Sequence, residues 1–297
     1  MWAERIAAGS TIGIFCPSHV GAEERYGPIV STLEWLGFKV RRGANFHGDA
    51  YGYAGSAEGR AADLNALASD PEVAMVMFNG GESSAEILPY VDFEAIRRNP
   101  KPYVSYSDGT TILSAIRAQT GLVTYYGVSG GVFSDLRHYD YVQFKSHLVE
   151  GCLADDAIAD IRLRPICGGS CDGELAGGYA PLFAFMLGSP YFRYDAGRRH
   201  LLFLEDHEIF SKVGSVATTL AFIGQSAFMK SVTGLLFGHY AASVPDDLYG
   251  LLARFGQAHG IPVAYTDDFG HGPRHAILPI GAEAMMDVGA GRIRLIG

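Results

Sequence analysis

The stretch Tyr103-Val104-Ser105-Tyr106-Ser107-Asp108-Gly109-Thr110-Thr111 joins a short apolar, β-branched run to a run that favours a helix, residues 112–119. At such a strand–turn–helix junction a serine is held on a tight turn, with its hydroxyl above the end of a sheet. The first amides of the following helix face the same space and can hold a developing oxyanion. Ser107 is therefore a candidate nucleophile.

Ser107 has an alternative role as the N-cap of that helix, because serine and aspartate are preferred at the cap position. The Gly-x-Ser-x-Gly pattern is half present: Gly109 follows Ser107 by two residues, but Ser105 precedes it by two. Taken alone, these residues favour the cap, so the rest of the chain has to distinguish the two roles.

The first half of the chain alternates apolar strands with helices. Strands are predicted at residues 11–15, 38–41, 73–78, 102–106 and 122–125, and helices at 22–36, 56–69 and 110–119. Near-continuous apolar strands separated by helices indicate a parallel sheet covered on both faces. Ligands bind beyond the carboxyl ends of the strands in such sheets. The loops that follow Phe78 and Tyr106 are thus expected to face one another.

The second half of the chain has a mixed pattern. Strands are predicted at residues 201–204, 232–238, 262–265 and 275–279 and in a hairpin over 286–296, and helices at 145–153, 214–223 and 246–259. The run 165–173 contains proline and several glycines and is typical of a linker. We expect an N-terminal parallel α/β domain (1–150), a linker (151–173) and a smaller, β-rich C-terminal α/β domain (174–297).

Composition excludes several classes of function. The formal net charge of −9 and the lack of a basic run argue against nucleic-acid binding. No apolar run is long enough to cross a membrane, and the N-terminus does not have the pattern of a signal peptide. The four cysteines (Cys16, Cys152, Cys167 and Cys171) form no metal-binding pattern and are interpreted as thiols in a reducing compartment. We expect a cytoplasmic protein.

Short blocks in a fixed order extend over nearly the whole chain. They are residues 11–18 (TIGIFCPS), 60–63 (RAAD), 70–73 (DPEV), 80–81 (GG), 87–92 (ILPYVD), 99–101 (NPK), 106–108 (YSD), 204–206 (LED), 269–271 (FGH) and 278–281 (LPIG). Together they resemble the LD-carboxypeptidases, a family that includes the microcin C immunity peptidases. The resemblance implies a serine hydrolase without a metal or another cofactor, and a possible homodimer.

The resemblance also implies the catalytic roles: Ser107 as nucleophile, His271 as base and Glu205 as the acid that orients the histidine. A serine hydroxyl needs a neighbouring base to remove its proton during attack. Histidine titrates near neutrality and can return that proton to the leaving amine, while a carboxylate on its other ring nitrogen fixes the tautomer.

Each of these residues has a structural alternative. Without the resemblance, Glu205 would be interpreted as a strand-end carboxylate, and His271 as a loop histidine. The glycines that flank His271 favour it as the base, because they permit a close backbone approach. The competing candidates nearby in the sequence are Asp206, His207, Glu208, His239 and His275, of which Glu208 is the strongest rival to Glu205.

Backbone amides are expected to form the oxyanion hole: that of Asp108 and one from Gly80-Gly81, although a Gly-Gly pair commonly marks only a tight turn. Glu82, Ser83 and Ser84 would then line the substrate side. Two of the departures from the family pattern concern residues of the candidate site. Ser105 occupies the place of a glycine, and Tyr179 the place of an asparagine that is expected to contact substrate.

Two substrate classes follow from the resemblance. One is an aminoacyl-nucleotide-like conjugate or small peptide, cleaved at an amide as in the immunity branch, which blocks 79–84 and 270–274 favour. The other is a cytoplasmic murein tetrapeptide with a terminal D-alanine. The alternative from another class is a ligand-binding protein that has kept the cleft and lost turnover.

Overall fold

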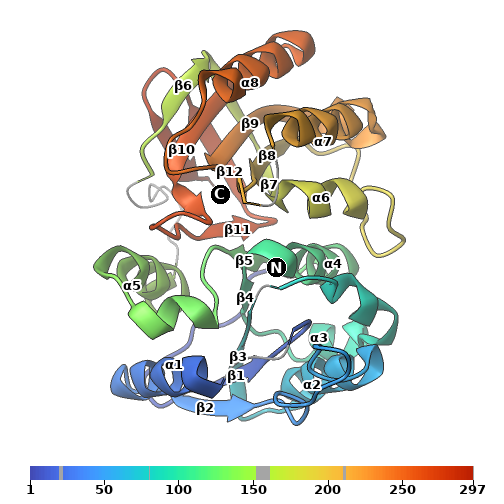
Figure 1. Cartoon of the computed structure of the whole chain (residues 1–297), viewed down its shortest axis with the longest axis vertical. Helices are drawn as coiled ribbons and strands as arrows, with labels where there is room; N and C mark the ends of the chain where they lie inside the picture. Colours follow the sequence, from blue (N-terminus) through green and yellow to red (C-terminus); the bar gives the residue numbers. More distant parts are fainter. Residues whose placement is uncertain (20–22, 80, 152–160, 210–211, 297) are drawn as a thin grey trace. The chain divides into compact units, whose positions relative to one another are not determined.

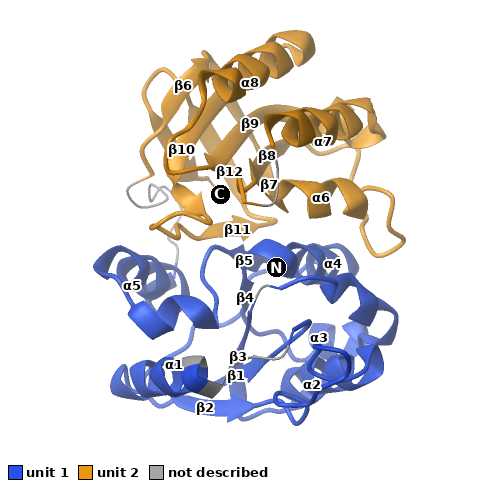
Figure 2. Ribbon diagram, in the orientation of Figure 1, with its two compact units in different colours: residues 1–151 blue, residues 152–297 orange. Residues whose placement is uncertain are grey.

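The structure, a computed structural model, describes residues 1–19, 23–79, 81–151, 161–209 and 212–296 (Figure 1). The chain divides into two compact units, Met1–Gly151 and Cys152–Gly297, which Figure 2 shows in two colours. Among the helices of the described residues, none has both the length and the apolar character needed to cross a membrane. Each unit is built around its own β-sheet.

The first unit contains a parallel sheet with the strand order β5–β4–β3–β1–β2. These strands are β1 (Thr11–Phe15), β2 (Lys39–Arg42), β3 (Val73–Phe78), β4 (Tyr103–Ser105) and β5 (Thr124–Tyr126). In Figure 1, α1 (Glu23–Trp35) and α5 (His138–Phe144) lie on one side of the sheet, and α2 (Ala57–Ser69), α3 (Phe93–Arg98) and α4 (Thr110–Thr120) on the other. The predicted parallel α/β fold is confirmed.

Local sequence explains where these helices begin and end. The Ser56 side chain accepts a hydrogen bond from the Gly59 amide and caps α2, as predicted. Asp92 caps α3 by accepting from the Ala95 amide, and α4 ends at Gly121, whose φ is 74°. The remaining helical turns are η1 (Ser84–Tyr90), η2 (Ser107–Gly109), η3 (Gly130–Asp135) and a π-helix, η4 (Lys145–Gly151). The predicted helix over 145–153 is helical as far as Gly151, but it continues α5 without a break, so the helical segment begins at His138 rather than at Lys145. Positions 152–153 lie outside the described residues.

The strand order reverses next to β1, since the chain moves from β1 outward to β2 and then returns to β3 on the other side. Such a switch point separates the loops at the carboxyl ends of the two strands and leaves room for a ligand. The loop after β1 contains Pro17 and Ser18, the loop after β3 leads to Gly81, and β4 beside β3 leads to Ser107. Ser84 donates a hydrogen bond to Asp108, so the loops that follow Phe78 and Tyr106 meet as predicted.

The second unit contains a seven-stranded sheet in the order β13–β12–β7–β8–β9–β10–β6. β7 (Ser170–Tyr179), β8 (His200–Glu205), β9 (Val232–His239) and β10 (Val263–Gly270) are parallel to one another, whereas β6 (Arg164–Cys167), β12 (Glu283–Asp287) and β13 (Arg292–Leu295) pair antiparallel. The helices α6 (Ala180–Met186), α7 (Val213–Gln225) and α8 (Asp246–His259) pack over an apolar core that includes Leu202, Phe237 and Val263. The two remaining short elements are η5 (Ala227–Ser231) and β11 (Leu278–Ile280).

The strands β6 and β7 occupy part of the segment 151–173 for which the sequence predicts a linker, so that prediction is wrong at 164–167 and 170–173. One of the glycines that suggest a linker there, Gly173, permits close strand packing instead, as does Gly177 further along β7. A Cβ on Gly173 would lie 2.7 Å from the carbonyl oxygen of Arg199, and one on Gly177 would lie 1.7 Å from that of Phe203. Residues 152–160 of the predicted linker lie outside the described residues.

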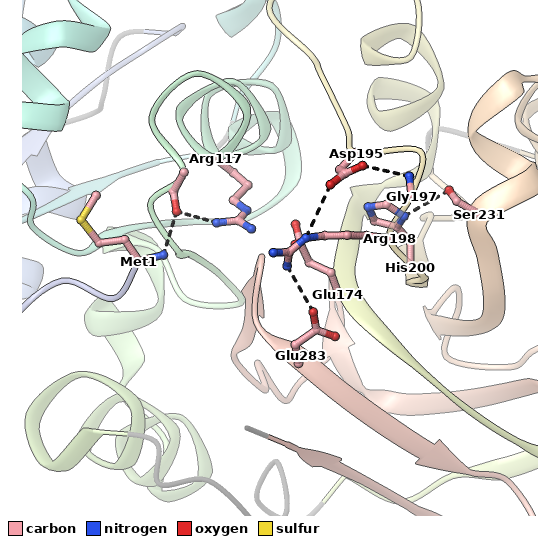
Figure 3. Close-up of polar contacts among 10 residues, drawn as sticks. Met1, Arg117, Glu174, Asp195, Gly197, Arg198, His200, Ser231 and Glu283 are labelled. Carbon is pink, nitrogen blue, oxygen red and sulfur yellow. Dashed lines mark hydrogen bonds and ion pairs between the residues drawn. The ribbon is translucent and has the colours of Figure 1, made fainter.

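At the amino ends of β7 and β8, away from the strand ends that carry the candidate residues, the Arg198 guanidinium lies among carboxylates (Figure 3). It is 3.3 Å from Glu174, 3.4 Å from Glu283 and 3.8 Å from Asp195. Arg198, Glu283 and Asp195 are about half-exposed or more, and such exposed pairs contribute little to stability individually. We interpret this cluster as structural.

Candidate active site

Ser107 lies on the turn η2 between β4 and α4, with a φ of 57°. A left-handed conformation is strained for a residue with a side chain and persists only where neighbouring contacts impose it. The Ser107 amide donates to the Tyr126 hydroxyl at 2.9 Å, and the Thr110 hydroxyl donates to the Ser107 carbonyl at 2.6 Å. The N-cap of α4 is Gly109 rather than Ser107, which removes the principal alternative role of this serine.

The departure at Ser105 is accommodated by Gly109. The Ser105 hydroxyl donates to the Phe78 carbonyl at 2.8 Å, so it is buried with its hydrogen bond made. A Cβ on Gly109 would lie 2.2 Å from the Ser105 Oγ atom. The serine before the turn therefore requires a glycine after it, and the turn keeps its tight form.

The glycine turn after β3 approaches the loop after β1. A Cβ on Gly81, whose φ is 158°, would lie 2.1 Å from the Oγ atom of Ser18, so only glycine fits there. Gly80, the other predicted oxyanion residue of this turn, lies outside the described residues. Glu82 and Ser83 are exposed, and Ser83 is left-handed with a φ of 70°.

The prediction that Ser84 lines the substrate side is wrong. This serine is completely buried and bonded to Asp108 and Thr111, so it does not line a substrate-facing surface. For Glu82 and Ser83, which are exposed, a place on the substrate side stays a prediction.

Four neighbouring parallel strands of the second unit end in polar side chains. Tyr179 ends β7, Glu205 ends β8, His239 ends β9, and His271 follows β10 directly. The Nδ1 atom of His271 lies 2.7 Å from Oε2 of Glu205, and the ring centroids of Tyr179 and His271 are 5.5 Å apart. The structure thus brings together the three candidate residues that the sequence places in this unit.

Glu205 is completely buried, and the His271 side chain is 14% exposed. Burial by itself lowers the pKa of His271, but the adjacent Glu205 carboxylate and, more weakly, Asp206 reverse that effect, so the pKa is raised. A carboxylate at Nδ1 holds the proton on that nitrogen and leaves Nε2 as the proton acceptor. The pair is suited to general base catalysis.

The rival residues have other contacts. Glu208 is exposed, and its amide donates to the Tyr240 carbonyl. The Nδ1 atom of His207 accepts from the Ile209 amide at 3.0 Å, and burial together with the nearby His271 lowers the pKa of His207. Asp206 accepts a hydrogen bond from the amide of the next residue, His239 lies 3.5 Å from Asp267, and His275 is partly buried.

The glycines beside His271 have the expected close approaches. A Cβ on Gly270, whose φ is 91°, would lie 2.9 Å from the Glu205 carboxylate, and one on Gly272 would lie 2.9 Å from the His239 ring. Gly270 thereby lets the Glu205 side chain reach the histidine.

The site also contains residues that the sequence interpretation missed. Tyr126 supplies the acceptor for the Ser107 amide, and Ser18 contacts the glycine turn. Tyr126 ends β5, whose pairing with β4 places Ser105 opposite it. Tyr126 directly follows the strand predicted at 122–125, and that position was the only indication in the sequence that it could reach the site.

A serine held on a strand–turn–helix junction and a buried Glu–His pair are the groups of a serine peptidase. The model of the LD-carboxypeptidase N-terminal domain matches residues 12–127, and that of the LD-carboxypeptidase C-terminal domain matches residues 172–286. The chain belongs to the LD-carboxypeptidase family, and the resemblance seen in the sequence is confirmed. It is therefore an enzyme, a peptidase of that family.

Individual relatives support this assignment. A probable murein peptide carboxypeptidase of Bacillus subtilis (strain 168) is 30% identical over 94% of this chain and 89% of its own length. The microcin C7 self-immunity protein MccF of Escherichia coli is 37% identical, but the match covers 42% of this chain and 38% of MccF. The chain is thus aligned with well under half of that relative. A solved MccF-like protein from Bacillus anthracis str. Ames has a TM-score of 0.90 at 23% identity, covering 100% of this chain and 99% of its own, which establishes the shared fold.

Proposed function

We propose that this protein is a serine carboxypeptidase or amidase that acts through Ser107, His271 and Glu205. The observation that carries the proposal is the buried Glu205–His271 pair, with its 2.7 Å contact at the carboxyl ends of parallel strands. The strained turn that presents Ser107 supports the nucleophile. The proposal requires the Ser107 hydroxyl and Nε2 of His271 to meet during the reaction.

In the proposed mechanism, the Ser107 oxygen attacks the carbonyl carbon of the scissile amide while His271 takes the hydroxyl proton. The amides of Asp108 and of the Gly80-Gly81 turn stabilise the negative oxygen of the tetrahedral intermediate. His271 then gives its proton to the leaving amine, and an acyl-enzyme ester remains. Water, deprotonated by His271, then attacks the ester carbonyl, the carboxylate product leaves, and His271 returns the proton to the Ser107 oxygen.

We propose a small peptide or an aminoacyl conjugate of the immunity type as substrate. Sequence blocks 79–84 and 270–274 support this class, and MccF has been solved in complex with aspartyl sulfamoyl adenosine. Glu82 and Ser83 are exposed beside the glycine turn and are proposed to face the substrate, as is Tyr179 beside the His271 ring.

A murein tetrapeptide is the second candidate substrate. The nearly full-length match to a probable murein peptide carboxypeptidase favours it, as does the fold shared with a muramoyltetrapeptide carboxypeptidase from Oxalobacter formigenes. Within the family resemblance we also propose a homodimer in the cytoplasm. Light scattering on the purified chain tests the dimer.

A turnover panel tests the function. The full chain is incubated separately with aspartyl sulfamoyl adenosine and a murein tetrapeptide, and the release of aspartate or of D-alanine is measured. We expect hydrolysis of the first, faster than of the second, and no hydrolysis by Ser107→Ala or His271→Ala. Faster cleavage of the tetrapeptide would assign the murein role, and full activity of Ser107→Ala would refute the mechanism.

A further inference from the structure

Two turns at the sheet edge of the first unit share an unusual backbone. Among the described residues other than glycine, Tyr51, Ser83 and Ser107 have a positive φ. Ser83 lies on the turn after β3, which we call the glycine turn, and Ser107 lies on η2, which we call the nucleophile turn. A left-handed conformation is unfavourable for a residue with a side chain and persists only where the surrounding contacts fix it.

Ser84 and Asp108, the residues that directly follow Ser83 and Ser107, are bonded to each other twice. The Ser84 amide donates to Oδ2 of Asp108 at 3.0 Å, and the Ser84 hydroxyl donates to the Asp108 carbonyl at 2.8 Å. Thr111 adds a hydrogen bond from its hydroxyl to the same carbonyl at 3.0 Å. We call the pair of Ser84 and Asp108 the turn clamp.

The turn clamp is buried. Ser84 is completely buried and Asp108 is 1% exposed, so neither side chain is available to substrate or solvent. Burial raises the pKa of the Asp108 carboxyl, against the hydrogen bonds from Ser84 that lower it. A buried carboxyl group costs free energy unless it accepts hydrogen bonds, so the bond from the Ser84 amide holds the Asp108 side chain in this position.

We propose that the side chains of Ser84 and Asp108 are positioning groups for the oxyanion hole, which hold the amide of Gly81 and the amide of Asp108 at a fixed separation. This rests on the proposed nucleophile, Ser107. Oxyanion stabilisation depends on donors placed in advance of the reaction, so loosening one turn relative to the other weakens the transition state more than the binding of substrate. Neither side chain touches the reacting atoms.

A fluorophosphonate probe tests the proposal without knowledge of the substrate. The Ser107 oxygen displaces fluoride from phosphorus, an O–P bond forms, and the hydroxyl proton passes to His271. The maximal labelling rate (kinact) and the half-saturating concentration (KI) are measured for the wild type and for Ser84→Ala, Asp108→Ala and Asp108→Asn. Thr124→Val is the matched control, because it removes another buried hydroxyl whose hydrogen bond goes to the Leu113 carbonyl at 3.2 Å.

We expect Ser84→Ala and Asp108→Ala to lower kinact by about 10- to 100-fold with little change in KI, since one oxyanion donor is worth about that much or more. Asp108→Asn should restore most of the rate, because the asparagine oxygen can still accept from the Ser84 amide. Thr124→Val should label like the wild type. Wild-type kinact in Ser84→Ala, or an Asp108→Asn variant as slow as Asp108→Ala, would overturn the proposal.

The experiment distinguishes a failure of the turn clamp from a failure of the proposed nucleophile. If Asp108→Ala fails to fold, Ser84→Ala still decides the question, because it removes the hydroxyl bond of the turn clamp and keeps the bond from its amide to the Asp108 carboxylate. If the wild type is not labelled, or Ser107→Ala is labelled, the proposed nucleophile is refuted. If Ser107→Ala is inert while Ser84→Ala labels normally, only the turn clamp is refuted.

Discussion

His271 and Glu205 share a hydrogen bond of 2.7 Å between Nδ1 and Oε2, with the carboxylate completely buried. Burial alone would make the imidazolium form of His271 unfavourable, and the carboxylate more than compensates for it. The Glu205 carboxylate therefore orients the His271 ring and stabilises the positive charge that forms when the ring takes a proton.

The pH dependence of hydrolysis should reflect this pair. The base must be neutral, and the pKa of His271 is raised above its usual value of 6.5, so the acidic limb of kcat/KM should lie above pH 6.5. In Glu205→Gln the main raising influence is lost and burial remains, so the limb should move to lower pH while the rate falls about 10⁴-fold. A limb that stays in place in Glu205→Gln would contradict the assignment.

Alanine substitution should separate the two glutamates near the end of β8. Glu205→Ala leaves the buried imidazole without its partner and should reduce kcat by about 10³- to 10⁴-fold. Glu208 is exposed, and Glu208→Ala should stay within about threefold of the wild type. Steady-state kinetics on the cleaved substrate measure both. An inactive Glu208→Ala beside an active Glu205→Ala would reverse the roles.

Gly270→Ala should impair catalysis through a steric contact. Its Cβ would lie 2.9 Å from the Glu205 carboxylate, and a displacement of that group by about 1 Å can cost about 10²-fold in rate. Gly291→Ala is the matched control: this glycine also has a positive φ, of 64°, but a Cβ there has nothing within 4 Å. Both variants should lose some stability on thermal unfolding, and only Gly270→Ala should lose activity.

Lys101 offers a test of stability in the first unit. Its Nζ donates to the carbonyls of Leu67 and Asp70 at the end of α2, and burial lowers its pKa to about 8. Lys101→Met removes both of these hydrogen bonds, although the Asp70 carbonyl keeps the one from the Val73 amide, and should cost about 1–3 kcal/mol at pH 7. Between pH 8 and about 10.5 the unfolded chain binds one more proton at this residue than the folded chain. The wild type should therefore gain stability relative to Lys101→Met as the pH rises through this range. Urea unfolding at several pH values measures the difference, and a constant difference would refute the shift.

Apolar runs and caps were sufficient to predict most of the first unit. The strands over 11–15 and 73–78 have the predicted bounds, because uninterrupted buried strands between helices leave few alternatives. In the second unit β7 was not predicted, because a glycine-rich segment is typical of a linker. The glycines of β7 are needed because the backbone of β8 lies close to them. The sequence alone does not show that β8 lies beside β7.

The candidate residues were predictable to a similar extent. The resemblance identified the Glu205–His271 pair, whose contact the structure then supplied. The bonds between Ser84 and Asp108 and that between Ser107 and Tyr126 join residues on different loops or strands, and their spacing in the sequence carries no signal of contact. Ser84 was wrongly expected to face substrate, because an exposed and a buried serine look alike in a polar loop.

The most direct test of the central proposal is peptide mapping by mass spectrometry after reaction with a fluorophosphonate. A single adduct on Ser107 is predicted, formed by the wild type, absent in Ser107→Ala and strongly reduced in His271→Ala. An adduct on another residue, or labelling that does not depend on His271, would contradict the proposed nucleophile and base.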